Sequence, residues 1–269
     1  MHLHYNEIIN LIIIGIITYF IFSLYLSIQT IKSIESKNNS KIIFIRNFNH
    51  TLINKFYYNI LNYFLNIVIS IDDDIAIKNI FNSNSNMNID IIIESIGGLI
   101  SSNDRILNTM ENFNNQINVY IFNYAWSAAT MIALASDNIY MNDYATFGPT
   151  DPQICIMNEM VSLQSINKLV KNKSIDKIAD IILINYYDSK CLYDMNYKQI
   201  SKFIKKHAKN NVSQKKINKL INFFALGNIP HDSTITYDML KEIININIQI
   251  PSDIKKIYNI VNKYFYLLN

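Results

Sequence analysis

A serine among small side chains is the residue of this sequence best suited to do chemistry. Ser127 follows the apolar stretch VYIFNYAW and directly precedes Ala128 and Ala129. A serine in this place is either a nucleophile or a helix-capping residue, because its hydroxyl can attack a carbonyl carbon or accept a hydrogen bond at a helix N-terminus. The small neighbours permit close approach of a substrate backbone. The local sequence leaves both interpretations open.

A glycine pair lies one structural unit earlier in the chain. Gly97 and Gly98 follow the apolar run IDIIIES and precede a helical pattern. Backbone N–H groups at such a strand-to-helix turn can hold a developing oxyanion, and the Ala128 N–H would be a second donor. The alternative is a tight turn with no chemical role.

These residues need a sheet to bring them together, and the pattern predicts one. Apolar strands alternate with helical segments, and strands without a polar face indicate a parallel sheet covered on both sides. The expected fold class is therefore α/β. The predicted strands cover 41–48, 67–71, 89–94, 117–122 and 138–141, and the predicted helices begin at 72, after 98 and at 127.

The strand signal fades after about Val161, and helical periodicity replaces it. Helices are expected over 176–191, 197–209 and 214–224, and Thr236 is expected to cap another. The predicted organisation is a membrane anchor at 1–30, an α/β core at 31–160 and a helical part of the same domain at 161–269.

The N-terminal segment Ile8–Ile28 is predicted to cross a membrane. It contains no charged residue and has about the 20 residues that a helix needs to span the hydrocarbon core. The segment before it lacks the basic start of a cleaved signal peptide. Basic residues follow the span, at Lys32, Lys37, Lys41 and Arg46, so the positive-inside rule predicts a single-pass protein with its main domain in the cytoplasm.

Composition excludes several other classes of protein. With 50% hydrophobic and 17% charged residues, the chain is expected to fold into a packed core despite its many asparagines. A net charge of +3 without a dense basic stripe argues against nucleic-acid binding. Cys155 and Cys191 have neither CxxC spacing nor histidines at ligand intervals, so a reducing compartment is expected and a metal site is not.

Three stretches carry a family resemblance. They are IDIIIESIGGLISSNDRILNTM, then VYIFNYAWSAATMIALASDNIYMNDYATFGPTDPQ, then NIPHDSTITYDMLKE. In this order they resemble the membrane-anchored serine dehydrogenase proteinase family, a branch of the Clp-protease and crotonase fold related to signal peptide peptidase A and the stomatin-operon serine proteases. The resemblance runs from about Lys41 to Leu240 and implies a peptide-bond hydrolase with a polypeptide substrate, no cofactor and a homo-oligomeric assembly.

The resemblance implies roles for further residues. Ser127 would be the nucleophile, with Gly98 or Gly97 and Ala128 forming the oxyanion hole. The loop from Gly148 to Asp151 lacks the histidine of the Clp peptidase, and the membrane-bound relatives use a lysine that corresponds by similarity to Lys168.

Lys168 has apolar sequence neighbours, and burial there would lower its pKa toward the neutral form that a base requires. Lys171 is its local competitor. Asp151 is expected to orient the lysine, to close the substrate loop or to cap that loop, and His231 also resembles a family position.

Two departures from the family pattern keep other functions open. Ile96 stands where the family usually has proline, and Ala129 where it has glycine. A membrane scaffold that has lost turnover is one alternative. Thioester hydrolysis or acyl transfer on coenzyme A esters is another, and for it Arg105 is the only basic residue near the glycine pair.

Overall fold

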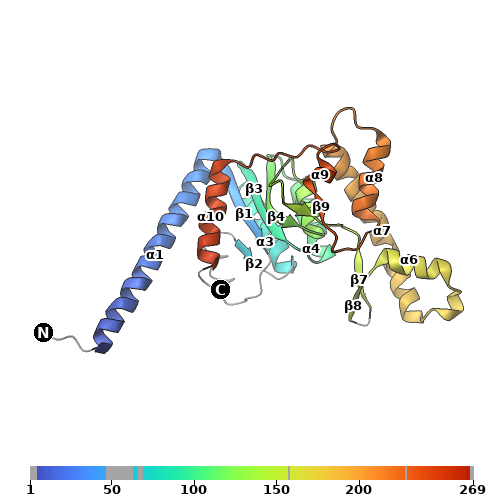
Figure 1. Cartoon of the computed structure of the whole chain (residues 1–269), viewed down its shortest axis with the longest axis horizontal. Helices are drawn as coiled ribbons and strands as arrows, with labels where there is room; N and C mark the ends of the chain where they lie inside the picture. The colour runs from blue at the N-terminus through green and yellow to red at the C-terminus, as the bar shows by residue number, and fades with distance from the viewer. Residues whose placement is uncertain (1–4, 47–62, 66–68, 157, 228, 267–269) are drawn as a thin grey trace. The chain divides into compact units, whose positions relative to one another are not determined.

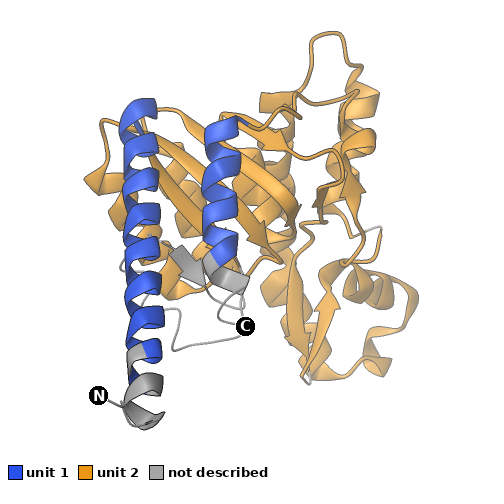
Figure 2. Cartoon of the chain, turned by 60° about the vertical axis from the view of Figure 1, so that its left-hand side comes forward, with its two compact units in different colours: residues 1–40, 251–269 blue, residues 41–250 orange. Residues whose placement is uncertain are grey.

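The chain folds into two compact units, which Figure 2 colours separately. The structure is a computed structural model that describes residues 5–46, 63–65, 69–156, 158–227 and 229–266. One unit comprises residues 1–40 and 251–269, and the other comprises residues 41–250. The predicted strands, the glycine pair and the serine all lie in the larger unit.

A mostly parallel sheet is the centre of the larger unit. Among the described residues it has seven strands, in the order β2-β1-β3-β4-β6-β9, with β5 also paired to β4. Figure 1 shows β1, β3 and β4 side by side. The pairs β3–β4, β4–β5 and β4–β6 are parallel, and only β6–β9 is antiparallel among those described. The predicted α/β class with a parallel sheet is therefore confirmed. The strands are β1 (Ser40–Arg46), β2 (Tyr63–Leu65), β3 (Asn88–Ser95), β4 (Ile117–Ala125), β5 (Asn138–Met141), β6 (Thr146–Phe147) and β9 (Ile235–Thr236).

The core lies between this sheet and its helices. Ile91, Ile93, Val119 and Ile121 have no exposed surface, which is why their strands read as continuous apolar runs. The helices of the unit are α3 (Ile71–Ser83), α4 (Ile100–Glu111), α5 (Ala128–Ala135), α6 (Leu163–Asn172), α7 (Asp180–His207), α8 (Gln214–Ala225) and α9 (Tyr237–Leu240). The helices α3, α4 and α5 lie close to where helices are predicted.

Local chemistry explains where α3 begins. The Ser70 N–H donates to Asp73 Oδ2 at 2.7 Å, and acidic residues fill the first turn. Carboxylates there satisfy free N–H groups and interact favourably with the helix dipole. The predicted strand over 67–71 is wrong at its end, because Ile71 is helical. Residues 66–68 lie outside the described part, and Ile69 forms only an isolated bridge to Gly98.

The second half of the chain differs from its prediction in two respects. The expected helices over 176–191 and 197–209 are one helix, α7, because no proline or glycine interrupts the stretch between them. A hairpin of β7 (Gln153–Ile156) and β8 (Glu159–Ser162) was not predicted. Thr236 directly precedes α9, as expected, but its side chain makes no capping hydrogen bond.

The smaller unit contains two helices among its described residues. They are α1 (Tyr5–Asn38) and α10 (Ser252–Tyr266), and Lys37 Nζ lies 2.7 Å from Asp253 Oδ2. The stretch Ile12–Asn38 is long and apolar enough to cross a membrane, with a mean hydropathy of 2.0 in its most apolar window. Large side chains are exposed all around its first half, including Ile13, Ile16, Tyr19 and Phe22. Length and composition thus agree with the predicted anchor.

Candidate active site

The glycine pair forms a tight loop against the turn that holds Ser127. Gly97 has φ of 105°, and a Cβ added there would lie 2.8 Å from Ser127 Cβ. Any side chain at this position would therefore clash, and an L-residue would also be strained. A Cβ on Gly98 would collide with the backbone of Ile69, whose N–H donates to Gly97 O at 2.9 Å. The loop is held in place from both sides.

Ser127 occupies a strained turn between β4 and α5. Its φ is 51° and its ψ is −120°, a conformation that non-glycine residues rarely adopt. The turn is held by two backbone bonds, from Trp126 N–H to Ser95 O and from Ala129 N–H to Trp126 O, each 2.9 Å long. A serine on a sharp strand-to-helix turn presents its hydroxyl above the carboxyl end of the sheet. Strain of this kind costs about 1–3 kcal/mol and is concentrated at functional sites.

Two backbone donors lie beside the serine. Gly98 and Ala128 both line the cavity that Ser127 lines. Within the described ranges, neither of their N–H groups has a backbone acceptor. The Gly97 N–H differs, since it donates to Ser95 Oγ at 3.1 Å. Of the two glycines, only Gly98 lines the cavity, and it is therefore the better candidate for an oxyanion donor.

A second loop, from Gly148 to Asp151, contributes Thr150 and Asp151 to the lining of the cavity. The Thr130 hydroxyl lies 2.6 Å from Ala125 O and 2.9 Å from Gly148 O, and thus joins the end of β4 to this loop. The Thr150 N–H donates to Phe224 O at 2.8 Å and fastens the loop to α8. These contacts place the next residue, Asp151, at the cavity.

Asp151 and His231 form a pair in the same cavity as Ser127. Asp151 Oδ1 lies 2.9 Å from His231 Nδ1, and the aspartate side chain is 3% exposed. Its Oδ2 has no partner among the described residues. A buried carboxylate at Nδ1 fixes the orientation of the imidazole and leaves Nε2 for another partner. His231 lies 80 positions along the chain from Asp151, so no local pattern in the sequence predicts their pairing.

Lys168 lies elsewhere. It is on α6, is exposed, and is not among the residues that line the Ser127 cavity. The expected burial of this lysine is therefore wrong. Leu163 and Ile166 form the buried face of α6, and a residue two positions after Ile166 is about 200° further around a helix. Lys171, the competitor, lines a separate cavity between α6 and α7.

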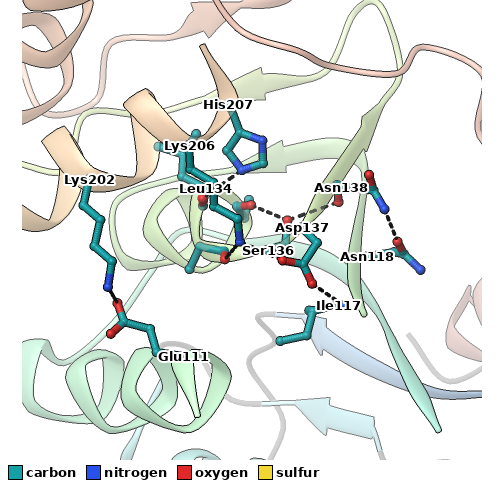
Figure 3. Close-up of polar contacts among 12 residues, drawn as sticks. Glu111, Ile117, Asn118, Leu134, Ser136, Asp137, Asn138, Lys202, Lys206 and His207 are labelled. Carbon is teal, nitrogen blue, oxygen red and sulfur yellow. Dashed lines mark hydrogen bonds and ion pairs between the residues drawn. The ribbon is translucent and has the colours of Figure 1, made fainter. Parts of the chain in front are cut away.

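The far end of α5 is capped by residues from α7, as Figure 3 shows. Lys206 Nζ donates to Ala135 O at 3.0 Å and to Asp137 Oδ1 at 2.8 Å. His207 Nε2 lies 3.1 Å from Leu134 O. Burial lowers the pKa of His207, and Lys206 lowers it further. The C-terminal carbonyls of the helix that begins at Ser127 are thus satisfied by a neighbouring helix.

A strained serine beside two N–H groups that lack acceptors among the described residues, on a parallel α/β sheet, is the arrangement expected at the active site of a serine hydrolase. Comparison with protein families identifies the particular one. Residues 2–266 match the model of the ClpP-like SDH-type serine proteinase, and the chain belongs to that family. The predicted family and fold are confirmed.

Relatives of known sequence include two uncharacterized proteins of Methanocaldococcus jannaschii. One is 31% identical over 170 residues, which are 62% of this chain and 56% of the relative. The other is 31% identical over 179 residues, which are 66% of this chain and 57% of the relative. The chain spans less than two thirds of the length of either relative.

Solved structures of similar fold have low sequence identity. A membrane-bound stomatin-specific protease, solved as a mutant with a substrate peptide, is 14% identical with a TM-score of 0.49, over 81% of this chain and 79% of that one. ClpP1 from Listeria monocytogenes is 13% identical with a TM-score of 0.46, over 78% and 92% of the two chains.

Proposed function

We propose that this chain is a membrane-bound serine peptidase that hydrolyses peptide bonds with Ser127 as its nucleophile. One observation carries the proposal: Ser127 is held in a strained turn on the cavity that Gly98, Ala128 and the Asp151–His231 pair also line. Membership of a serine proteinase family supports the same reaction.

The proposed reaction starts when Ser127 Oγ attacks the carbonyl carbon of the scissile peptide bond. Its proton passes to a base, and the carbonyl oxygen becomes an oxyanion that accepts hydrogen bonds from the Gly98 and Ala128 N–H groups. The C–N bond then breaks as the protonated base returns the proton to the leaving amine. Water hydrolyses the acyl-enzyme by the same steps.

The base is proposed to be His231, positioned by Asp151. The pair shares the cavity with Ser127, and imidazole is the commonest general base. Lys168, the base of the Ser127–Lys168 dyad expected from the family resemblance, is the alternative, and it requires α6 to bring an exposed side chain into the cavity.

The experiment that tests this function is labelling of the detergent-solubilised chain with a fluorophosphonate. Labelling is expected at Ser127 and absent in Ser127→Ala. Loss of more than about 100-fold in His231→Gln with little change in Lys168→Ala would support the proposed base. The reverse pattern would establish the Ser–Lys dyad. Lys173→Ala is the matched control, because Lys173 is also an exposed lysine that does not line the cavity. Equal labelling of wild type and Ser127→Ala would contradict the peptidase.

Ile96 and Ala129, the two residues that depart from the family pattern, do not line the cavity. Ala129 is fully buried in α5 and does not line it, and Ile96 is 44% exposed at the loop. This argues for turnover and against the scaffold.

Arg105 pairs with Asp74 at 2.6 Å, and none of the described residues lining the cavity is a lysine or arginine. Coenzyme A esters, whose phosphates need such cations, are thereby disfavoured.

The remaining parts of the proposal concern location and assembly. The apolar stretch of α1 is proposed to be a retained single-pass anchor with the larger unit in the cytoplasm, since the basic residues follow the span. A polypeptide substrate and a homo-oligomeric assembly are proposed from the family.

A further inference from the structure

Four polar side chains form one wall of the Ser127 cavity. Asn103 and Asp104 come from α4, and Asn196 and Gln199 come from α7. The proposed reaction uses none of them. Polar groups placed in a mostly apolar pocket usually set which ligand it accepts, so the atoms that they direct into the cavity are informative.

The amide nitrogens of this wall are engaged within the protein. Asn196 Nδ2 lies 3.4 Å from Ala225 O, and Gln199 Nε2 lies 3.4 Å from Asp104 Oδ1. A backbone carbonyl oxygen and a carboxylate oxygen can only accept hydrogen bonds. The atoms of Asn196 and Gln199 that face these partners are therefore the amide nitrogens. The amide oxygens of Asn196 and Gln199 are therefore the atoms left to accept a hydrogen bond from a ligand.

Asn103 shows the same arrangement at a buried position. Its side chain is 2% exposed, and its Nδ2 contacts Met131 Sδ at 3.3 Å. Its Oδ1 is buried with no partner in the described part of the chain. An unsatisfied buried acceptor is unfavourable, and a ligand that donates a hydrogen bond to it would remove that cost.

Asp104 adds a negative charge to these oxygens. The nearest donor to its carboxylate in the described structure is Gln199 Nε2, at the long distance of 3.4 Å. No lysine or arginine lines the cavity among the described residues. The wall thus offers acceptors and one charge, and a complementary ligand carries donors and a positive charge.

The rest of the cavity suits an aliphatic chain. It has a volume of about 130 Å³, and its apolar lining comprises Ile100, Met131, Met160, Leu192 and Met195. Methionine side chains adapt to unbranched chains because they are flexible and polarizable. An aliphatic stem with a cationic end matches both the apolar lining and the polar wall.

We propose that this cavity binds a lysine or arginine side chain of the substrate, on the residue that precedes the scissile bond. The stem lies against the methionines, and the cationic group donates to Asn103 Oδ1, to the Asp104 carboxylate and to the Gln199 amide oxygen. The inference rests on the proposed peptidase function and names its substrate class.

Peptidyl diphenylphosphonates test the subsite without a known substrate. Each probe forms a bond between phosphorus and Ser127 Oγ and releases phenol. Three probes are compared on the detergent-solubilised full chain, with lysine, norleucine or glutamate side chains beside the phosphorus. The lysine probe is expected to label Ser127 about tenfold faster than norleucine, and glutamate slowest, because a charge-assisted hydrogen bond favours the cation.

Variants of the wall locate the effect. Asp104→Asn is expected to bring the lysine-to-norleucine ratio close to one, and Asn103→Leu to lower it severalfold. Asp188→Asn, an exposed aspartate of α7 outside the cavity, makes the same change in charge and should keep the wild-type ratio. Labelling by a small fluorophosphonate, which does not fill the subsite, shows whether each variant keeps its folded site.

The outcomes separate the two proposals. Normal fluorophosphonate labelling with norleucine equal to or faster than lysine would overturn the subsite and leave the peptidase intact. A lysine-to-norleucine labelling ratio that is unchanged in Asp104→Asn would also overturn the proposed subsite. Failure of wild type to react with any phosphonate would overturn the peptidase function and the subsite with it.

Discussion

At the scale of single residues, the site depends on two backbone conformations that most side chains do not tolerate. Ser127 has positive φ although it carries a side chain, and Gly97 has positive φ directly against it. The strain at Ser127 is maintained because the surrounding hydrogen bonds leave the turn no alternative. The absence of a Cβ at Gly97 gives Ser127 its space.

Gly97→Ala should therefore strongly reduce the reactivity of Ser127. The new methyl would lie 2.8 Å from Ser127 Cβ and 2.9 Å from the Ala128 nitrogen. We expect fluorophosphonate labelling to fall by a factor on the order of 10²–10³, as after the loss of an oxyanion donor. Gly15→Ala is the matched control, because nothing lies within 4 Å of its added methyl. Wild-type labelling in Gly97→Ala would show that the loop is not part of the site.

At the scale of elements, α5 is fixed at both ends by side-chain hydrogen bonds that connect it to other segments. Thr130 ties its first turn to β4 and to the Gly148 loop, and Lys206 and His207 cap its last carbonyls (Figure 3). An eight-residue helix has little stability of its own, so these contacts determine where Ser127 is held.

Thr130→Val tests the first of these contacts. The substitution keeps the shape but removes the donor to Gly148 O and leaves Ala125 O and the Gly148 N–H with only each other, which should cost about 1–3 kcal/mol of unfolding free energy. Thr109→Val is the control, because the Thr109 hydroxyl is exposed and bonds only within its helix. Chemical denaturation measures both. Equal losses in the two variants would contradict a specific role for Thr130.

Because His207 is buried, we expect the free energy of unfolding to depend on pH. Burial lowers the pKa of His207 below the unfolded value, so the unfolded chain binds the extra proton at mildly acid pH. Stability is complete above about pH 6.5 and declines as the pH falls below it, with a slope of up to about 1.4 kcal/mol per pH unit. The Lys206 charge acts in the same direction, while Asp137 and the carbonyls opposite the ring oppose it.

Unfolding of wild type and His207→Gln between pH 7.5 and 5.0 measures this dependence, with the pH values chosen to bracket about 6.5. Other titrating groups contribute equally to both proteins, so the difference isolates His207. We expect the wild type to lose more stability than the variant as the pH falls. Parallel curves would exclude His207 as the source.

At the scale of the whole molecule, the proposed anchor and the larger unit are joined in one chain, and the proposed orientation in the membrane would decide which substrates that unit reaches. The chain has 2 cysteines, Cys155 and Cys191, and both are free and exposed in the larger unit. They report on which side of the membrane that unit lies.

A membrane-impermeant maleimide added to sealed cells or right-side-out vesicles should leave both cysteines unlabelled if the larger unit is cytoplasmic. Labelling should appear after permeabilisation. The variant with both cysteines replaced by serine is the control for background. Labelling before permeabilisation would reverse the proposed orientation, and release of the protein by alkaline carbonate would contradict the membrane span.

Much of the fold could be predicted from the sequence because its signals are local. The apolar run at Ile89–Ile93 and the small-residue helix after Ser127 are specified by their own residues, and both elements occur where they were expected. The β7–β8 hairpin was missed because its residues alternate weakly, and the single helix α7 was divided in two because its pattern fades between Cys191 and Tyr197.

The sequence by itself determined the α/β class, the apolar helix and the strand-turn-helix position of Ser127, because each depends on neighbours along the chain. The tertiary structure decided which titratable groups share the cavity with that serine. Apolar neighbours in sequence did not bury Lys168, since a helix directs adjacent residues to different faces. Asp151 and His231 meet only because two distant loops converge at the carboxyl edge of one sheet, and no local pattern encodes that distance.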